Sequence, residues 1–149
     1  MPTASVLDVA RYILEKLGSM TAMKLQKLVY YCQAWSLVWD GFPLFSESIE
    51  AWANGPVVRK LFEAHREQFN VYPSGLQGNI ESLTAVEKQT IDSVLDYYGD
   101  KPSQWLSDLT HMEDPWKNAR ADLPDGTRSD REITLASMHQ YYESISPKE

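Results

Sequence analysis

The sequence is short of cysteine and of long apolar runs, and each shortage excludes a class of protein. Cys32 is the single cysteine, so internal disulfides are excluded, and a reducing cytoplasm suits the chain. No apolar run approaches the roughly 18 residues that span a bilayer. The first residues also lack the basic flank and apolar block of a signal peptide. We therefore expect a cytoplasmic protein that does not use a membrane as a partner.

Basic residues are scarce relative to acidic ones. The chain has 14 Lys and Arg against 21 Asp and Glu, which gives a net charge of -7, and no basic cluster stands out. Binding to a phosphate backbone requires clustered Lys and Arg. Nucleic acid is therefore a poor candidate for the main ligand, whereas a basic protein partner would gain association rate from the acidic field.

Motifs for metal binding and for catalysis are also lacking. His65, His111 and His139 lie far apart, and Cys32 falls on an apolar stripe, so no metal-ligand spacing exists. Gly-rich phosphate loops and G-x-S-x-G are absent. We expect no cofactor, no metal and no enzymatic activity. A small hydrolase that uses Cys32 or His111 is an alternative.

Capping residues and apolar periodicity predict helices in the N-terminal part. Ser5 with Asp8 opens a first helix that ends at Gly18. Thr21 opens a longer helix that ends at Gly41. The sequence thus begins with two helices joined by a short turn. This resembles a helix-turn-helix entry, so a DNA-binding transcriptional regulator is a further alternative, which the acidic balance disfavours.

The C-terminal half predicts three more helices. Thr84 with Glu87 forms a capping box that opens one of them, and Gly99 ends it. A short helix follows Pro102, residues 118–132 are expected to form a loop, and the last helix begins at Thr134. The short helix carries Trp105, Leu109 and Met112 on one face. The residues of the last helix that we expect to face inward are Leu135, Met138, Tyr142 and Ile145.

The middle of the chain predicts a short strand and a further helix. Residues Ile49 to Trp52 are expected to form a strand or hairpin. A helix is expected from Pro56 to about Phe69, with Phe69 facing inward. The fold class is therefore mainly α, with residues 1–149 in a single compact domain of about five to six helices.

The Gly-Pro pair at the start of that middle helix suggests a binding site. Gly55 as the N-cap offers no side-chain oxygen, so the N–H groups of residues 57–59 lack a cap. Arg59 and Lys60 add positive charge in the first turn, which favours an anion such as a partner's carboxylate. The alternative is that Glu50, Asn54 or water satisfies these groups.

Three runs of the sequence resemble a known family. KLQKLVYY (24–31), AWANGPV (51–57) and THMEDPW (110–116) match, in this order, the pattern of the Panacea antitoxin domain. That family includes SocA-like antitoxins and GepA-like phage-associated proteins. The resemblance covers about residues 5–145.

The resemblance implies a helical antitoxin that neutralises a cognate toxin, encoded by a neighbouring gene, through direct protein–protein binding. It also implies, for some members, delivery of the toxin to a cellular protease. We combine the family motifs with the argument from the Gly-Pro helix start to predict the partner-binding residues. These are Lys24, Lys27, Tyr31, Trp52, Gly55, Pro56, Arg59, Lys60, His111 and Trp116.

Overall fold

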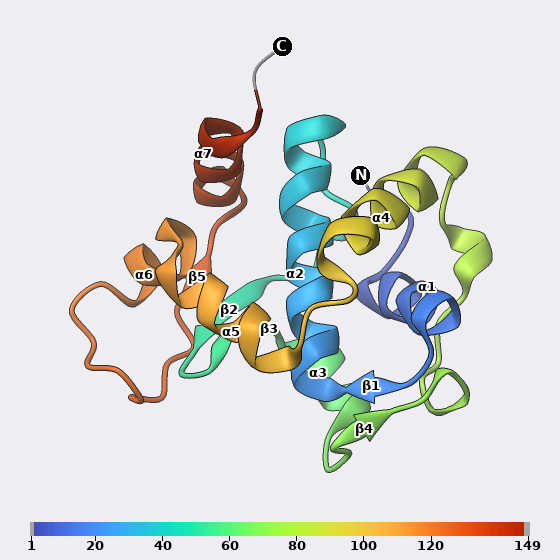
Figure 1. The fold of residues 1–149 in the computed structure, drawn as a ribbon, viewed down its shortest axis with the longest axis horizontal. Coiled ribbons are helices and arrows are strands. Elements are labelled where there is room, and N and C mark those ends of the chain that lie inside the picture. Colours follow the sequence, from blue (N-terminus) through green and yellow to red (C-terminus); the bar gives the residue numbers. More distant parts are fainter. Residues whose placement is uncertain (1, 148–149) are drawn as a thin grey trace.

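The computed structural model describes residues 2–147, and seven α-helices lie in that range (Figure 1). They are α1 (Val6–Leu17), α2 (Ala22–Trp39), α3 (Arg59–His65), α4 (Ala85–Tyr98), α5 (Ser103–Met112), α6 (Asp114–Arg120) and α7 (Leu135–Ile145). The strands are β1 (Met20–Thr21), β2 (Ile49–Trp52), β3 (Gly55–Val58), β4 (Asn70–Val71) and β5 (Glu132–Ile133). The prediction of a mainly helical, compact fold is confirmed.

Helix α2 is the centre of the fold. Its residues from Leu25 to Leu37 are all buried, as is expected of a helix that is covered on every side. Helices α1, α4, α5 and α7 pack around it (Figure 1). The polar side chains of α2 are therefore buried together with the apolar ones, and each of them needs an internal partner.

The predicted helix starts are confirmed where a side chain caps the helix. Ser5 and Asp8 form a reciprocal capping box at α1. Thr84 caps α4, whereas Thr21 and Thr134 cap α2 and α7. Each of these hydroxyl groups accepts a hydrogen bond from a backbone N–H in the first turn, which is the reason that the local sequence is sufficient to place the helix start.

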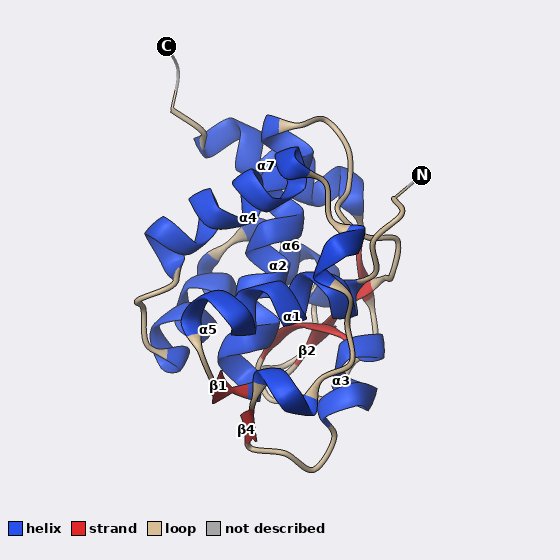
Figure 2. Ribbon diagram, turned by 90° about the vertical axis from the view of Figure 1, so that its right-hand side faces the viewer, coloured by secondary structure: helices blue, strands red, loops and turns tan. Residues whose placement is uncertain are grey.

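Two small sheets complete the fold. Strand β2 pairs with β3 and with β5, both antiparallel, in the order β3-β2-β5, whereas β1 pairs with β4. In the larger sheet Ala51 lies opposite Pro56, and Ile49 lies opposite both Val58 and Ile133. Figure 2 shows the strands in red, with α4 and α7 toward the opposite side of the molecule. The predicted strand at Ile49–Trp52 is confirmed.

The predicted helix from Pro56 to Phe69 is wrong at both ends. Gly55–Val58 is strand β3, and the helix comprises only Arg59–His65. Pairing with β2 outweighs the local preference of Pro56 for a first helical position, because the strand is buried along its whole length. Phe69 lies beyond the helix and is 78% exposed, so the prediction that it faces inward is also wrong.

The apolar face predicted for α5 is not its buried face. Trp105 and Met112 are exposed, whereas Leu106, Ser107 and Thr110 are buried. The buried face carries hydroxyl groups that form hydrogen bonds, so apolar periodicity selects the other side of the helix.

Two further differences concern the C-terminal part. The predicted loop from residue 118 begins inside α6, which continues to Arg120. In α7, Met138 and Tyr142 are buried as predicted, but Leu135 and Ile145 are exposed. The exposed pair lies at the two ends of the helix, where fewer neighbouring elements cover it.

Gln33 holds the chain that follows α2. Its Oε1 accepts hydrogen bonds from the N–H groups of Leu44 (2.8 Å) and Phe45 (3.4 Å), and its Nε2 donates to the Phe45 carbonyl (2.8 Å). All three residues are fully buried. One side chain therefore satisfies three backbone groups that have no access to water.

We expect Gln33→Leu to lower the free energy of unfolding by about 3 kcal/mol or more, because it leaves these backbone groups unsatisfied. Urea denaturation provides the measurement. Gln89→Leu, at an exposed position of α4, is the matched control and should change stability by less than about 0.5 kcal/mol. Equal effects of the two substitutions would contradict the role assigned to Gln33.

Candidate partner-binding site

The β2–β3 hairpin is held by side chains from three helices. From α2, Gln26 Nε2 donates to the Val58 carbonyl (3.3 Å) and Lys27 Nζ donates to the Pro56 carbonyl (3.2 Å). Three further carbonyls of the hairpin are bonded by Ser107 of α5 at Asn54, and by Trp116 and Arg120 of α6 at Trp52 and Ala51. The backbone of the hairpin is thereby fixed in place from outside its own sheet.

Gln26 also settles what satisfies the backbone before α3. Its Oε1 accepts a hydrogen bond from the Val58 N–H (2.9 Å), and its Nε2 lies 3.0 Å from Nε2 of His65. Val57, in turn, lies opposite Glu50 in the ladder. No helix starts at Pro56, so the uncapped helix N-terminus predicted there as an anion site does not exist: the segment is a strand, and its final N–H, of Val58, is bonded to Gln26.

Arg59 pairs with Glu50 through two hydrogen bonds, at 2.8 Å and 3.2 Å. Glu50 Oε1 also accepts from the indole N–H of Trp52 (2.8 Å), and the guanidinium lies 5.3 Å from the Trp52 ring. Half of the Arg59 side chain is exposed, so the ion pair contributes little to stability. Its main effect is to fix the orientation of the Trp52 side chain.

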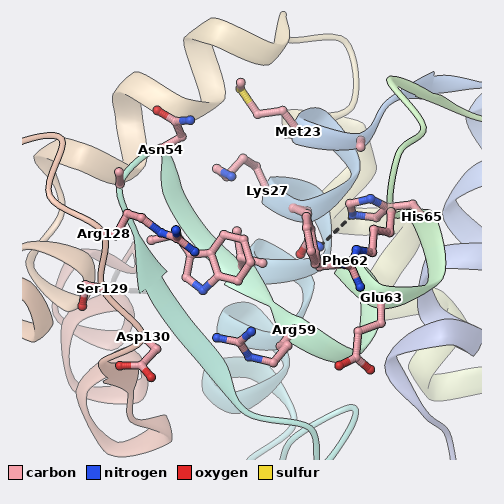
Figure 3. Close-up of a pocket in the computed structure, with 16 residues that line it drawn as sticks. Met23, Lys27, Asn54, Arg59, Phe62, Glu63, His65, Arg128, Ser129 and Asp130 are labelled. Atoms are coloured by element: carbon pink, nitrogen blue, oxygen red, sulfur yellow. Dashed lines mark hydrogen bonds between the residues drawn. The ribbon is translucent and has the colours of Figure 1, made fainter.

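A pocket of about 740 Å³ lies beside the hairpin (Figure 3), within the size range of ligand sites. Helices α2 and α3, the hairpin and the segment 128–130 supply its wall. Trp52 and Phe62 meet edge to face at 5.0 Å on its apolar side. The charged residues that line it are Lys27, Arg59, Glu63, Arg66, Arg128 and Asp130. Four cations thus face two carboxylates in a chain that is acidic as a whole.

Lys27 is the most unusual residue of this wall. It is 1% exposed, and among residues 2–147 it makes one hydrogen bond, to Pro56, and no ion pair. Burial lowers the pKa of Lys27 from 10.5 to about 7, because the charged ammonium is separated from water. Burial, and next the positive charge of Lys27, lower the pKa of His111. The interior next to the pocket is therefore unfavourable for positive charge.

Gly55 is required by its contact with Lys27. Its φ is +124°, and a Cβ at this position would overlap the Lys27 side chain and lie 3.1 Å from Thr110 Oγ1. Gly55 therefore allows the hairpin backbone to lie directly against Lys27 and α5. This contact connects all three motif runs, since they contain Lys27, Gly55 and Thr110 respectively.

Tyr31, one helical turn after Lys27 in α2, belongs to a second buried polar network. Its hydroxyl group donates to Glu113 Oε1 (2.7 Å), as does that of Tyr142 (2.6 Å), and Tyr30 lies 3.0 Å from the Tyr142 hydroxyl. Burial raises the pKa of Glu113, although the hydrogen bonds from the two tyrosines oppose the shift. Tyr31 is thus placed in the interior, and sequence reasoning missed Glu113, whose carboxylate lies inside the THMEDPW run.

His111 and Trp116 form a second interior contact. Their rings stack at 4.1 Å, and Trp116 is 6% exposed. Nε2 of His111 is buried and has no hydrogen-bond partner in the described part of the chain.

The predicted partner-binding residues therefore fall into groups. Lys27, Trp52 and Arg59 line the pocket. Four of them are buried and do not line the pocket, namely Tyr31, Gly55, Pro56 and Trp116, and His111 is half-buried. The remaining two, Lys24 and exposed Lys60, do not line the pocket either. Sequence reasoning missed Met23, Phe62 and His65 as lining residues. The sequence offers no signal for Met23, because its exposure is known only from the structure.

Cys32 lies in the hydrophobic core and is fully buried. Burial raises the pKa of its thiol, so very little of the reactive thiolate is present at neutral pH. Within residues 2–147, no group of three His, Cys, Asp or Glu side chains is arranged to hold a metal ion.

We expect Gly55→Ala to lower the free energy of unfolding by about 1–3 kcal/mol, because the new Cβ requires an unfavourable φ and displaces Lys27. Gly126→Ala is the control, since Gly126 also has a positive φ (+85°) but open space around it. The difference between the two variants in urea denaturation reports the contact with Lys27. Equal losses would contradict the packing argument.

Lys27→Met should change the pH dependence of stability. The folded protein releases the Lys27 proton near pH 7, whereas the unfolded chain keeps it to about 10.5, so the unfolded state binds more protons between these values. The contribution of wild-type Lys27 to stability is therefore lowest below pH 7 and rises with pH above it. The free energy of unfolding of Lys27→Met relative to that of the wild type should be highest near pH 6 and lower at pH 9.

Urea denaturation at several pH values between 6 and 9 measures this difference. The lost hydrogen bond to Pro56 adds a penalty that does not depend on pH, so only the slope is diagnostic. Lys60→Met, at an exposed lysine, is the matched control. A flat difference for Lys27→Met would show that Lys27 titrates normally.

The part of the chain that matches a known family contains most of the elements that form this site. Residues 25–117 match the family model described as antitoxin SocA-like, Panacea domain, and this segment includes most of α2, the hairpin and α5. Comparisons with curated proteins and with solved structures give no match. In the described part of the chain, no helix combines the length and apolar character needed to cross a membrane. Since the match covers well over half of the 149 residues, the chain belongs to the family of SocA-like antitoxins with a Panacea domain.

Proposed function

We propose that this protein is an antitoxin that neutralises its cognate toxin by binding it directly at the pocket beside the β2–β3 hairpin. The observation that carries the proposal is the pocket itself, which lies at the hairpin that the family motifs hold in place. Its apolar wall and its arginines are the residue types that commonly anchor protein interfaces.

Rigidity of the hairpin supports a binding role. Side chains from α2, α5 and α6 fix its carbonyl groups, and Glu50 holds both Arg59 and the Trp52 indole. A surface that is ordered before binding loses less conformational entropy when a partner docks. The arrangement thus favours recognition of a protein over a catalytic role for buried Cys32, whose thiol is poorly ionised.

Co-expression tests this function. The protein encoded beside this chain should arrest growth when it is produced alone, and the arrest should be relieved when this chain is produced with it. The two proteins should also co-purify. A neighbouring product that neither arrests growth nor binds would contradict the proposal. Faster loss of the toxin in the presence of this chain, dependent on a cellular protease, would reveal the adaptor role.

Charge reversal at the pocket should weaken this rescue. We expect Arg66→Glu combined with Arg128→Glu to reduce affinity for the toxin by about tenfold or more, since both side chains line the pocket and are exposed. The control is Lys88→Glu combined with Lys60→Glu, which changes the charge equally at positions that do not line the pocket. Calorimetric titration measures both. Equal weakening would place the toxin elsewhere.

A further inference from the structure

Lys27 lacks a counter-charge. Its ammonium is buried in the wall of the pocket, donates one hydrogen bond to the Pro56 carbonyl, and pairs with no carboxylate among residues 2–147. Burial of an ammonium without a partner of opposite charge is costly. The pocket therefore contains a cation whose electrostatic requirements the described chain does not meet.

The charges around Lys27 increase this deficit. His65 of α3 and His111 of α5 supply no negative charge; burial, with a further contribution from the positive charge of Lys27, lowers the pKa of each. Arg66 and Arg128 add further positive charge to the lining.

The nearby carboxylates do not compensate for it. Glu50 is already bonded to Arg59 and Trp52. Glu63 and Asp130 line the pocket but form no ion pair with Lys27. Figure 3 shows both carboxylates on the lower side of the pocket, whereas Lys27 projects from α2 on the upper side, near Met23 and Asn54.

We propose that this pocket receives a carboxylate of a polypeptide partner, an Asp or Glu side chain or a C-terminus, which pairs with the Lys27 ammonium. An apolar residue next to that carboxylate packs against Trp52 and Phe62. The proposal rests on the proposed function, because the partner that supplies the carboxylate is the toxin.

The composition of the wall indicates a carboxylate. One ammonium with two N–H groups left for a ligand matches a single negative charge, whereas a phosphate group carries up to about two charges and is bound best by several donors. Arg59, which also lines the pocket, is already engaged by Glu50.

The size of the pocket indicates a polypeptide. Its volume of about 740 Å³ is sufficient for more than one side chain, and Met23, Trp52 and Phe62 give it an apolar wall. A segment that contains an acidic and an apolar residue side by side uses both parts of the pocket. A small free acid would leave the apolar wall uncovered.

Proton uptake should accompany binding. A carboxylate beside Lys27 stabilises its charged form, so the complex takes up protons near pH 7 to 8, where the free protein has partly neutral Lys27. Burial lowers the pKa of His65 and of His111 from the ordinary value, so any proton uptake by these rings falls below that range. The uptake that disappears in Lys27→Met is the part that belongs to Lys27.

Short peptides provide a direct test on the full chain. The probes are acetyl-Phe-Glu-amide and acetyl-Glu-Phe-amide, their Gln counterparts, and acetyl-Gln-Phe with a free C-terminal carboxylate. NMR titration should show that the carboxylate peptides shift the Lys27 side-chain and Trp52 indole resonances, with at least tenfold weaker binding of the neutral peptides. Lys27→Met should abolish this preference, and Lys60→Met should retain it.

Several outcomes would overturn the proposal. Equal binding of the Glu and Gln peptides, or no binding at millimolar concentration, would show that Lys27 does not select a carboxylate. Acetate that binds as tightly as the peptides would assign the site to small free acids. Should Lys27→Met fail to fold, the comparison of Glu with Gln peptides on the wild type still decides, because it needs no variant.

The growth assay separates this proposal from the proposed function. If the wild type rescues growth and a folded Lys27→Met protein rescues equally well, the antitoxin function holds and the role of Lys27 is overturned. If the wild type neither rescues growth nor binds the neighbouring product, the proposed function falls, while the peptide titration still reports on the pocket.

Discussion

The hydrogen bonds that helices α2, α5 and α6 make to the β2–β3 hairpin are the interaction on which the rest of the structure depends. A two-stranded hairpin is at best marginally stable in isolation. Here its carbonyl groups accept from side chains on three helices, and Gln26 bonds both the N–H and the carbonyl of Val58. The hairpin is therefore ordered by the helical core, and the pocket that it borders is ordered with it.

The same interactions explain why polar residues occupy the middle of α2. A helix covered on all sides would usually be apolar, yet Gln26, Lys27 and Gln33 are buried within it. Each bonds a backbone group of a segment that packs against the helix. Buried amides and carbonyls must be paired, so these side chains set where the following segments lie as well as how stable they are.

The family assignment and the pocket meet at the contact of Lys27 with Gly55. The family match covers most of α2, the hairpin and α5, and the pocket opens beside this contact. Gly55 allows the hairpin to lie against a lysine whose charge has no partner in the described chain. The interactions that stabilise the fold thus also leave a cation and an aromatic pair at the edge of the hairpin, which is the physical basis of the proposed recognition of a toxin.

The sequence by itself determined the features that depend on neighbours along the chain. Ser5, Thr21, Thr84 and Thr134 cap their own helices, so the starts of α1, α2, α4 and α7 follow from local chemistry. The motif runs likewise identified the family. They also pointed to Lys27 as a partner-binding residue. They could not distinguish a residue that lines the pocket, such as Lys27, from one that does not, such as Tyr31.

Only the tertiary structure decided the remainder. Pro56 has the local preference of a helix start, but pairing with Ala51 places it in a strand. The buried contacts of that strand contribute more free energy than the local preference does. The inward face of α5 carries Ser107, whose hydroxyl group donates to the Asn54 carbonyl of the hairpin. The pocket combines residues near positions 23–27, 52–66 and 128–130, and no local rule brings segments so far apart in the chain together.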